Sequence, residues 1–321
     1  MKIVHLDTLT TTMDGLALDA LEALGDFVGY KNTSPAKVVQ RSKDADVIIT
    51  NKVVIDKEIL DQLPNLKYIC VSATGYNCVD VDHAANKNIP VSNVADYSTS
   101  GVAQMVFAHL LNVLINISYY DEEVIDGRWQ KTGSFTFYDH SIRELSGKTM
   151  GIYGFGTIGQ EVGKIATAFG MNVIATSRHP ERDEQPWAKI VDFETLCRSS
   201  DFVTLHASLN EDSKGIIDKY ALSNMKPTAI LINTGRGDLI VEQDLAIALE
   251  NDVINYACLD VLSSEPPKDN NPLLNAKNCI ITPHIAWASI ESRERLINGI
   301  AQNIKSFIDG EEILNQVNKR S

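Results

Sequence analysis

The chain has 321 residues, a length that suits about two domains, and its 44% hydrophobic and 22% charged residues are ordinary for a globular protein. A net charge of −13 at pH 7 opposes binding to the phosphate backbone of a nucleic acid, and a small anionic substrate would need a dedicated arginine or lysine. No apolar run approaches the length of a membrane span, and the sequence enters a strand-like segment at its start, so we expect a cytoplasmic protein without a membrane partner.

The first half of the chain alternates short β-branched runs with helical segments, a pattern typical of a parallel sheet covered by helices. Helical segments are predicted over residues 16–24 and 57–62. The five predicted strands are residues 2–6, 27–30, 47–50, 68–72 and 90–93. A long helical run over residues 100–120 follows them. The first half therefore accounts for one sheet, and the long helix would lead out of it.

A glycine-rich segment, KTMGIYGFGTIG at residues 148–159, opens a second series of strands. It joins a predicted strand at 149–153 to a predicted helix at 160–169, and another strand follows at 172–176. In such a unit the glycines permit a tight turn, close approach of a pyrophosphate and packing of helix on strand. Other α/β proteins also carry glycine-rich turns, but this context favours a dinucleotide site at Gly154, Phe155, Gly156, Thr157, Ile158 and Gly159.

The remaining strands of the second series are predicted at residues 202–206, 229–233, 255–259 and 279–282, and a helix at 288–307 follows the last one. We expect this helix to return to the first sheet. The predicted fold class is therefore α/β with two doubly wound parallel-sheet domains. A Rossmann dinucleotide-binding domain, residues 100–287, would be inserted into a flavodoxin-like substrate domain made of residues 1–99 and 288–321. Ligands would bind in the cleft between the domains, outside the carboxyl ends of the strands.

Three polar residues follow strands of the second series and suit one reaction. His284 would exchange a proton with a substrate oxygen, Glu265 would fix the ring of His284, and Arg236 would hold a carboxylate with its planar fork. Together they suit the reduction of a 2-keto acid beside a nicotinamide. Each residue taken alone has an ordinary reading as a strand-end or loop side chain.

The five cysteines are an odd number and have no CxxC spacing. We interpret them as buried free thiols, and we expect no metal site. They are Cys70, Cys78, Cys197, Cys258 and Cys279.

The motifs GFGTIG, NTGRG, SSEPP and TPHIAWAS, in this order, resemble those of the D-isomer-specific 2-hydroxyacid dehydrogenases, and the resemblance covers nearly the whole chain. It implies an NAD(P)-dependent oxidoreductase that forms a homodimer through residues 119–144. Substrate-binding roles are implied for Ala73, Thr74, Gly75, Asn51 and Arg236. Cofactor-binding roles beside the glycine loop are implied for His206, Ala207, Thr234, Gly235, Asp260 and His284.

The substrate expected from the resemblance is a small 2-keto acid. The stretch YSTSGVAQMVFAHLL, the triplet GRW and the chain length are most similar to glycerate dehydrogenases, also called hydroxypyruvate reductases. The expected reaction converts hydroxypyruvate or glyoxylate to D-glycerate or glycolate. The alternatives are a dehydrogenase for D-lactate or another D-2-hydroxy acid, and a nucleotide-sensing protein similar to the family's corepressors. Trp287 follows the histidine closely and leaves the side-chain preference open.

The cofactor expected from the sequence is NADP(H). Members that prefer NAD carry an aspartate at the end of the second strand, where it bonds the adenosine ribose and repels a 2′-phosphate. Here Ser177 and Arg178 stand at this place, and a hydroxyl and a guanidinium suit a phosphate better. The alternative is that Arg178 is solvated and that NAD(H) binds.

Overall fold

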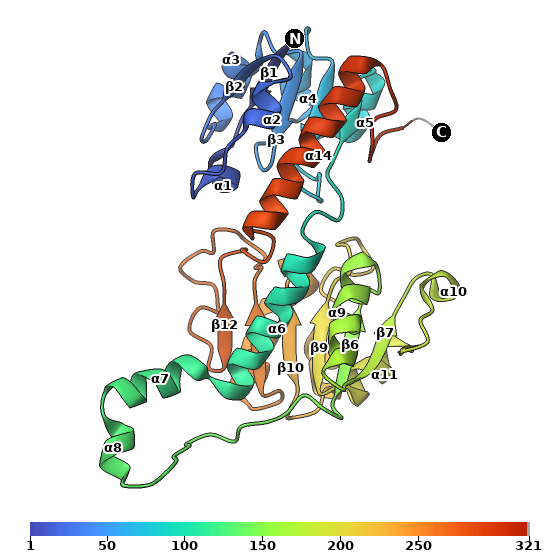
Figure 1. Cartoon of the computed structure of the whole chain (residues 1–321). Helices are drawn as coiled ribbons and strands as arrows, with labels where there is room; N and C mark the ends of the chain where they lie inside the picture. The colour runs from blue at the N-terminus through green and yellow to red at the C-terminus, as the bar shows by residue number, and fades with distance from the viewer. Residues whose placement is uncertain (320–321) are drawn as a thin grey trace. The chain divides into compact units, whose positions relative to one another are not determined.

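The computed structural model describes residues 1–319 and divides into two compact units (Figure 1). Unit 1 is made of Met1–Ser98 together with the segment from Trp287 onward, and unit 2 is Thr99–Ala286. Each unit holds one parallel sheet, with five strands in unit 1 and seven in unit 2. The predicted fold class, α/β with two doubly wound parallel sheets, is confirmed.

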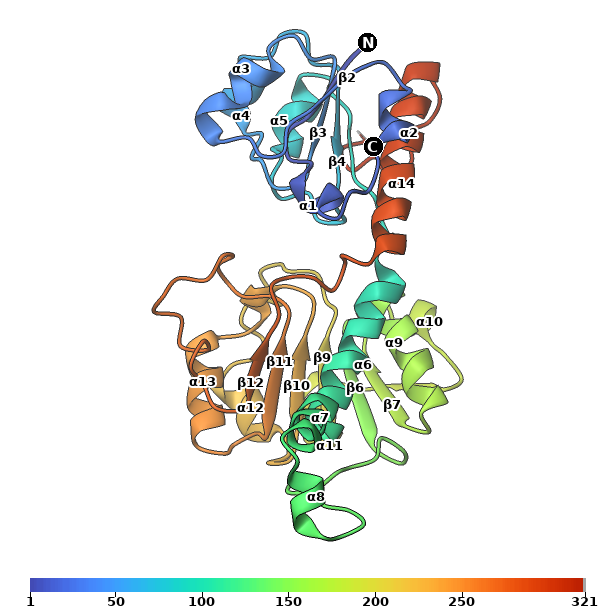
Figure 2. The ribbon, with the colours of Figure 1, turned by 60° about the vertical axis from the view of Figure 1, so that its left-hand side comes forward.

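The sheet of unit 1 has the strand order β2-β1-β3-β4-β5, and helices cover both of its faces (Figure 2). Its central strands β3 and β4 have no exposed residue, as parallel strands between two helix layers require. The strands are β1 (Lys2–His5), β2 (Asp26–Gly29), β3 (Val47–Thr50), β4 (Tyr68–Val71) and β5 (Val91–Ser92). The helices are α1 (Leu9–Thr12), α2 (Asp19–Glu22), α3 (Val38–Ser42), α4 (Lys57–Asp61), α5 (Val81–Asn86) and α14 (Ile290–Asp309), with a 3₁₀ turn η1 (Pro35–Lys37).

Helix α14 completes the core of unit 1 from the far end of the sequence. One of the two apolar clusters of this unit joins side chains of β1, β3 and β4 to four residues of α14. The ring of Phe307 stacks on that of Tyr68, with 4.8 Å between the centroids. The four α14 residues are Leu296, Ile297, Ile300 and Ile304.

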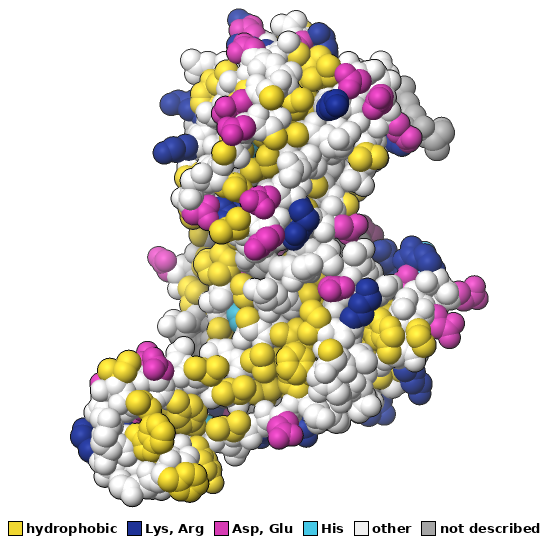
Figure 3. All heavy atoms as spheres, in the orientation of Figure 1, with side chains coloured by type: hydrophobic (Ala, Val, Ile, Leu, Met, Phe, Trp, Pro, Cys, Tyr) yellow, Lys and Arg dark blue, Asp and Glu magenta, His cyan; other side chains and the backbone are white. Residues whose placement is uncertain are grey.

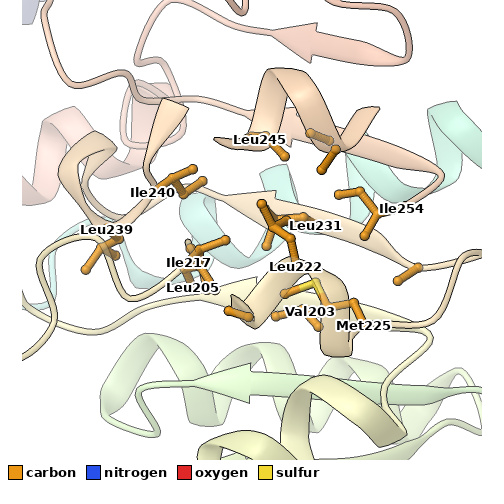
Figure 4. Packing of buried hydrophobic residues seen from close by; sticks show 14 of the residues in the cluster. Val203, Leu205, Ile217, Leu222, Met225, Leu231, Leu239, Ile240, Leu245 and Ile254 are labelled. Atoms are coloured by element: carbon orange, nitrogen blue, oxygen red, sulfur yellow. The ribbon is translucent and has the colours of Figure 1, made fainter. Parts of the chain in front are cut away.

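The sheet of unit 2 has the order β12-β11-β10-β9-β6-β7-β8. Helices α6 and α9 pack on one face, and α11, α12 and α13 pack on the other (Figure 2). Figure 4 shows part of the apolar cluster between this sheet and α11, α12 and α13, in which Leu205 and Leu231 of the sheet pack with Leu222 and Leu245 of the helices. The strands are β6 (Thr149–Tyr153), β7 (Asn172–Thr176), β8 (Ala188–Ile190), β9 (Phe202–Leu205), β10 (Ile230–Asn233), β11 (Tyr256–Leu259) and β12 (Cys279–Ile281). The helices are α6 (Thr99–Ile115), α7 (Ile117–Ile125), α8 (Arg128–Thr132), α9 (Thr157–Ala168), α10 (Pro180–Asp183), α11 (Phe193–Ser199), α12 (Lys219–Asn224) and α13 (Glu242–Glu250), with a 3₁₀ turn η2 (Gly237–Leu239).

Two elements of unit 2 differ from the sequence prediction. The helix predicted over residues 100–120 is broken at Asn116, whose φ of 53° is left-handed, and α6 and α7 meet at 49°. Asparagine tolerates this backbone better than most residues, and the break turns α7 out of the line of α6. Strand β8 was not predicted, because three residues at a sheet edge give too short a pattern. Among residues 1–319 no single helix is long and apolar enough to span a membrane, although α6 and α7 together reach that length and composition.

A segment we call the arm, residues 117–144, extends from the sheet of unit 2 and includes α7 and α8 (Figure 1). Charged hydrogen bonds stabilise it: Arg128 donates to Asp139 at 2.6 Å from both terminal nitrogens and to Glu123 at 2.6 Å. Six large apolar side chains of the arm are exposed, and Figure 3 shows hydrophobic side chains on the lobe at the lower left. The six are Ile117, Ile125, Trp129, Phe135, Tyr138 and Ile142, with Phe135 89% exposed.

Candidate active site

The parallel register of unit 2 brings the predicted catalytic segments to one edge of its sheet. Asn233 at the end of β10 pairs with Leu259 of β11, and Leu259 pairs with Ile281 of β12. The segments that carry Arg236, Glu265 and His284 therefore leave three neighbouring strands at the same edge. Ligands of parallel sheets bind outside this edge.

His284 and Glu265 form a direct pair. The ring Nδ1 of His284 lies 2.6 Å from Oε2 of Glu265, and Oε1 accepts a hydrogen bond from the Leu262 amide at 3.1 Å. A carboxylate only accepts, so Nδ1 is the donor and Nε2 is left for a substrate. Within residues 1–319 Nε2 makes no hydrogen bond, and the side chain is 28% exposed. The structure thus brings the predicted histidine and glutamate into contact in unit 2.

Arg236 lies in a loop that backbone contacts hold against the loop leading to Glu265. A Cβ at Gly237 would lie 1.9 Å from the carbonyl carbon of Leu262, so only glycine fits there. Asn233 braces the Arg236 loop: its side chain accepts from the Gly235 amide at 3.0 Å and donates to the Arg236 carbonyl at 2.8 Å. The guanidinium donates to the Gly235 carbonyl at 2.7 Å and makes no ion pair within residues 1–319. Its other N–H groups remain for an anion.

The glycine loop has the geometry of an anion cradle. Gly154 has a φ of 94°, and a Cβ there would lie 2.4 Å from the Ala207 amide nitrogen. Space in front of Gly156 is open, with no atom within 4 Å of a Cβ built there. Helix α9 begins at Thr157 without a side-chain cap, so its first-turn N–H groups are available. These features fit the pyrophosphate of a dinucleotide.

A cavity of about 330 Å³ continues from this cradle across the ends of β6, β7 and β9. Its lining includes the loop itself and the segment after β7, where a cofactor's adenosine ribose would lie. His206 and Ala207 line it as well, and the His206 ring is 2.9 Å from the Thr204 hydroxyl. Burial lowers the pKa of His206, so this ring is neutral and borders the cavity without charge.

The charged groups at the β7 end of the cavity are arranged differently from what the sequence suggested. The Ser177 hydroxyl donates to Asp183 at 2.5 Å and accepts from the His179 amide at 2.8 Å. Arg182 donates to the same carboxylate at 2.8 Å, and this bond together with that of Ser177 holds the pKa of Asp183 below its usual range. Ser177 thus has no free proton for a phosphate. Arg178 is exposed, lines the cavity and makes no ion pair within residues 1–319.

Two other predicted cofactor residues are buried at the same edge. Thr234 follows β10, and its hydroxyl oxygen is buried without a hydrogen-bond partner in the described chain. Asp260 follows β11 and is 1% exposed. Its carboxylate accepts from the Thr282 hydroxyl at 2.6 Å, the Ile285 amide at 2.9 Å and the Ala286 amide at 2.8 Å. It is thus occupied by internal donors.

The predicted substrate residues of unit 1 lie at the carboxyl ends of β3 and β4. Asn51 is buried, its amide donates to Asp7 at 2.9 Å, and its side chain donates to Thr10 at 3.4 Å. After β4, Thr74 is exposed and Ala73 is buried. The amides of Thr74 and Gly75 donate no hydrogen bond within residues 1–319. This loop therefore offers free N–H groups, whereas the donors of Asn51 are engaged.

Three further residues were not assigned correctly from the sequence. Asp183 was not predicted, because the aspartate typical of members that prefer NAD stands at the end of the second strand itself. Thr282, within TPHIAWAS, was missed as a hydroxyl that bonds Asp260. Trp287 belongs to unit 1, where it packs edge-on against Tyr97 with 6.5 Å between centroids.

All five cysteines are free thiols. Cys70, Cys197 and Cys258 are buried as expected, whereas Cys78 and Cys279 are half-buried. No group of three or more potential ligands for a metal ion gathers anywhere in the described chain.

Comparisons with known proteins agree on one family. The sequence profile described as "D-isomer specific 2-hydroxyacid dehydrogenase, NAD binding domain" matches residues 107–286. A hydroxypyruvate reductase of Blautia hydrogenotrophica is 42% identical over 99% of this chain and 100% of its own length. Among solved structures, an acyclic imino acid reductase in complex with NADPH and D-Arg is 32% identical, with a TM-score of 0.86 over 99% of this chain and 100% of that one. A D-lactate dehydrogenase of Aquifex aeolicus, complexed with NAD and lactic acid, is 26% identical, with a TM-score of 0.83 over the full length of both chains.

Two glycine variants distinguish the contribution of the glycine loop to stability from its contribution to dinucleotide binding. Gly156→Ala meets no atom, so we expect an unchanged Tm but a dinucleotide Kd raised about a hundredfold, because the methyl group occupies the path of the pyrophosphate. Gly154→Ala combines a strained backbone with a contact on Ala207, and it should lower Tm by several degrees. Calorimetry and nucleotide fluorescence measure both effects. If Gly156→Ala binds the dinucleotide as tightly as the wild type, the proposal that the glycine loop binds the pyrophosphate is wrong.

Proposed function

The chain belongs to the family of D-isomer-specific 2-hydroxyacid dehydrogenases, and we propose that it reduces hydroxypyruvate or glyoxylate to D-glycerate or glycolate. The observation that carries the proposal is the His284–Glu265 pair at 2.6 Å, at the sheet edge where the Arg236 loop also ends. The relative named hydroxypyruvate reductase, 42% identical along the whole chain, supports this choice of substrate. The reaction class itself follows from the family.

His284 moves the proton in this proposal. Its Nδ1 is held by Glu265, so Nε2 donates a proton to the substrate carbonyl oxygen in reduction and takes it back from the hydroxyl in oxidation. Glu265 accepts from Nδ1 and so keeps the ring in one orientation and one tautomer. When bound, the nicotinamide supplies or accepts the hydride.

Arg236 holds the substrate carboxylate in this proposal. The free N–H groups of Arg236 form a planar fork that matches a carboxylate and polarises the neighbouring carbonyl. In unit 1, substrate-binding roles are proposed for Ala73 and for the free amides of Thr74 and Gly75. Asn51 is assigned a supporting place, since its side chain already bonds Thr10.

We expect His284→Gln to lower kcat by about a thousandfold, because the general acid and base is lost while the fold is kept. Arg236→Gln should lower kcat and raise the keto-acid KM together. The matched control is His83→Gln, which removes another histidine bonded to a carboxylate, Asp61 at 2.9 Å, in unit 1. Steady-state assays with hydroxypyruvate, glyoxylate, pyruvate and 3-phosphohydroxypyruvate measure these effects.

The same assays test the proposed substrate. A clear preference for pyruvate or another 2-keto acid would replace hydroxypyruvate by that substrate and leave the mechanism in place. No turnover of any keto acid, with dinucleotide binding retained, would support a nucleotide-sensing binding protein instead.

NADP(H) is the proposed cofactor, and Arg178 carries this choice. It lines the cavity beside the place of the adenosine ribose and makes no ion pair within residues 1–319. Arg182 is neutralised by Asp183, so Arg178 is the cation with charge available for a 2′-phosphate. The Asp183 carboxylate opposes this phosphate, so we expect a preference rather than exclusion of NAD(H).

Arg178→Ala should lower kcat/KM for NADPH about tenfold or more and leave that for NADH nearly unchanged, because a charged hydrogen bond is lost only for the phosphate. Arg198→Ala is the matched control, since Arg198 is exposed and lies on α11 outside the cavity. A wild-type enzyme that prefers NADH would refute the proposed cofactor preference.

A cytoplasmic location suits the free thiols. Disulfides are rare in the reducing cytoplasm, and all five cysteines of this chain are free. We therefore propose that the protein works there.

We propose a homodimer that forms through the arm. Six large apolar side chains of this short segment are exposed to solvent. The arm is held by charged hydrogen bonds such as that of Arg128 to Asp139, and these do not cover the six side chains (Figure 3). A second arm, related by a twofold axis, would cover them with the same surface.

Sedimentation velocity of the wild type should give twice the mass of one chain. Phe135→Asp combined with Tyr138→Asp should give the mass of one chain, because two charges would be buried in the interface. Tyr220→Asp, at a side chain 63% exposed on α12 outside the arm, is the control and should remain a dimer. A monomeric wild type at micromolar concentration would exclude this dimer.

A further inference from the structure

A chain of three side chains runs from α6 to the segment that carries His284. Nε2 of His109 in α6 lies 3.1 Å from the hydroxyl of Thr282, which follows β12. This hydroxyl lies 2.6 Å from Oδ1 of Asp260, which follows β11. His109 is 4% exposed and Asp260 1% exposed, so two of the three groups are sealed from water.

Hydrogen-bond chemistry fixes the direction of this chain. The carboxylate of Asp260 only accepts, so the single proton of the Thr282 hydroxyl points to it. The hydroxyl oxygen must then accept from His109, whose Nε2 carries the proton. Burial lowers the pKa of His109 against the attraction of Asp260, which keeps the ring neutral. Three groups far apart in the sequence are thereby held in one arrangement.

Asp260 connects this hydrogen-bonded chain to the backbone of residues 284–286. Its two carboxylate oxygens accept from the amides of Ile285 and Ala286 at 2.9 and 2.8 Å. Its carbonyl accepts from the amide of His284 at 2.9 Å. Because one aspartate bonds three successive amides, rotation of its side chain would release two of them at once.

The backbone of His284 needs this support. Its φ of 53° lies in the left-handed region, which is uncommon for residues other than glycine, although histidine adopts it more often than most. Such a conformation persists where the surrounding structure holds it in place. Thr282 adds a second tie, because its carbonyl also accepts from the His284 amide at 2.9 Å.

We propose that His109 and Thr282 are positioning residues that hold Asp260, and through it the backbone of residues 284–286, so that the His284 ring stays aimed for proton transfer. This inference rests on the proposed role of His284. It assigns to α6, whose buried apolar side chains pack on the sheet of unit 2, one residue that acts on the reaction.

Two pairs of variants in the full-length enzyme test the proposal. Thr282→Val keeps the shape but loses the hydroxyl, whereas Thr282→Ser keeps the hydroxyl. His109→Leu removes the donor, whereas His109→Gln retains an N–H at a similar reach. We expect Thr282→Val and His109→Leu to lower kcat about tenfold, because small misplacements of a catalytic group are costly. Their dinucleotide Kd should change by less than about threefold. Thr282→Ser and His109→Gln should restore kcat to within about threefold of the wild type.

The outcomes separate this inference from the proposed function. Wild-type kcat in Thr282→Val and His109→Leu, alongside an inactive His284→Gln, would overturn the positioning role and leave the role of His284 standing. An equal loss in Thr282→Ser and Thr282→Val would also overturn it, because the hydroxyl would then be irrelevant. Full activity of His284→Gln would instead overturn the proposed function. If Thr282→Val does not fold, the His109 pair decides.

Discussion

The common direction of the strands in unit 2 is the constraint on which its chemistry depends. In a parallel sheet every strand ends at the same edge, so residues from distant parts of the sequence meet there without long loops. Backbone packing then sets the spacing: Gly237 contacts Leu262, and Gly154 contacts Ala207. The side chains at this edge are held mainly by backbone donors and acceptors, as Glu265 and Asp260 illustrate. Backbone groups are more rigid than side chains, so the edge is well suited to aiming a proton donor.

Two of the carboxylates at the edge of the unit 2 sheet are paired with nitrogen donors, whereas two arginines are not. Glu265 pairs with His284 and Asp183 pairs with Arg182, so both of these carboxylates have a cationic or N–H partner. Arg236 and Arg178 are the cations near this edge that have no carboxylate partner within residues 1–319, and they lie in the segments after β10 and β7. For a chain with a net charge of −13, such unpaired arginines are what makes binding of an anionic substrate or a phosphate favourable.

The sequence allowed the family, the fold class and most strands to be predicted because their signals are contiguous. Glycines at fixed spacing and polar residues just after β-branched runs can be recognised without knowing which strands are neighbours. The features that could not be predicted depend on tertiary contacts or on very short segments. Nothing in the sequence near Ser177 indicates that Asp183 accepts a hydrogen bond from its hydroxyl. Nothing near His109 indicates that its ring contacts Thr282, 173 residues away. The break at Asn116 was missed because the apolar pattern continues across it.

Because α14 packs in unit 1 but follows unit 2 in the sequence, unit 1 cannot be completed before unit 2 has been synthesised. One face of the unit 1 sheet is covered by Leu296, Ile297, Ile300 and Ile304, which a ribosome adds only after the whole of unit 2. During synthesis the first sheet therefore waits with that face uncovered, while all strands of unit 2 become available before α14 does. Nascent chains generally fold unit by unit as each becomes complete. Here the unit that begins the sequence is the last to be complete, so the face of its sheet that α14 covers stays open until the end of synthesis.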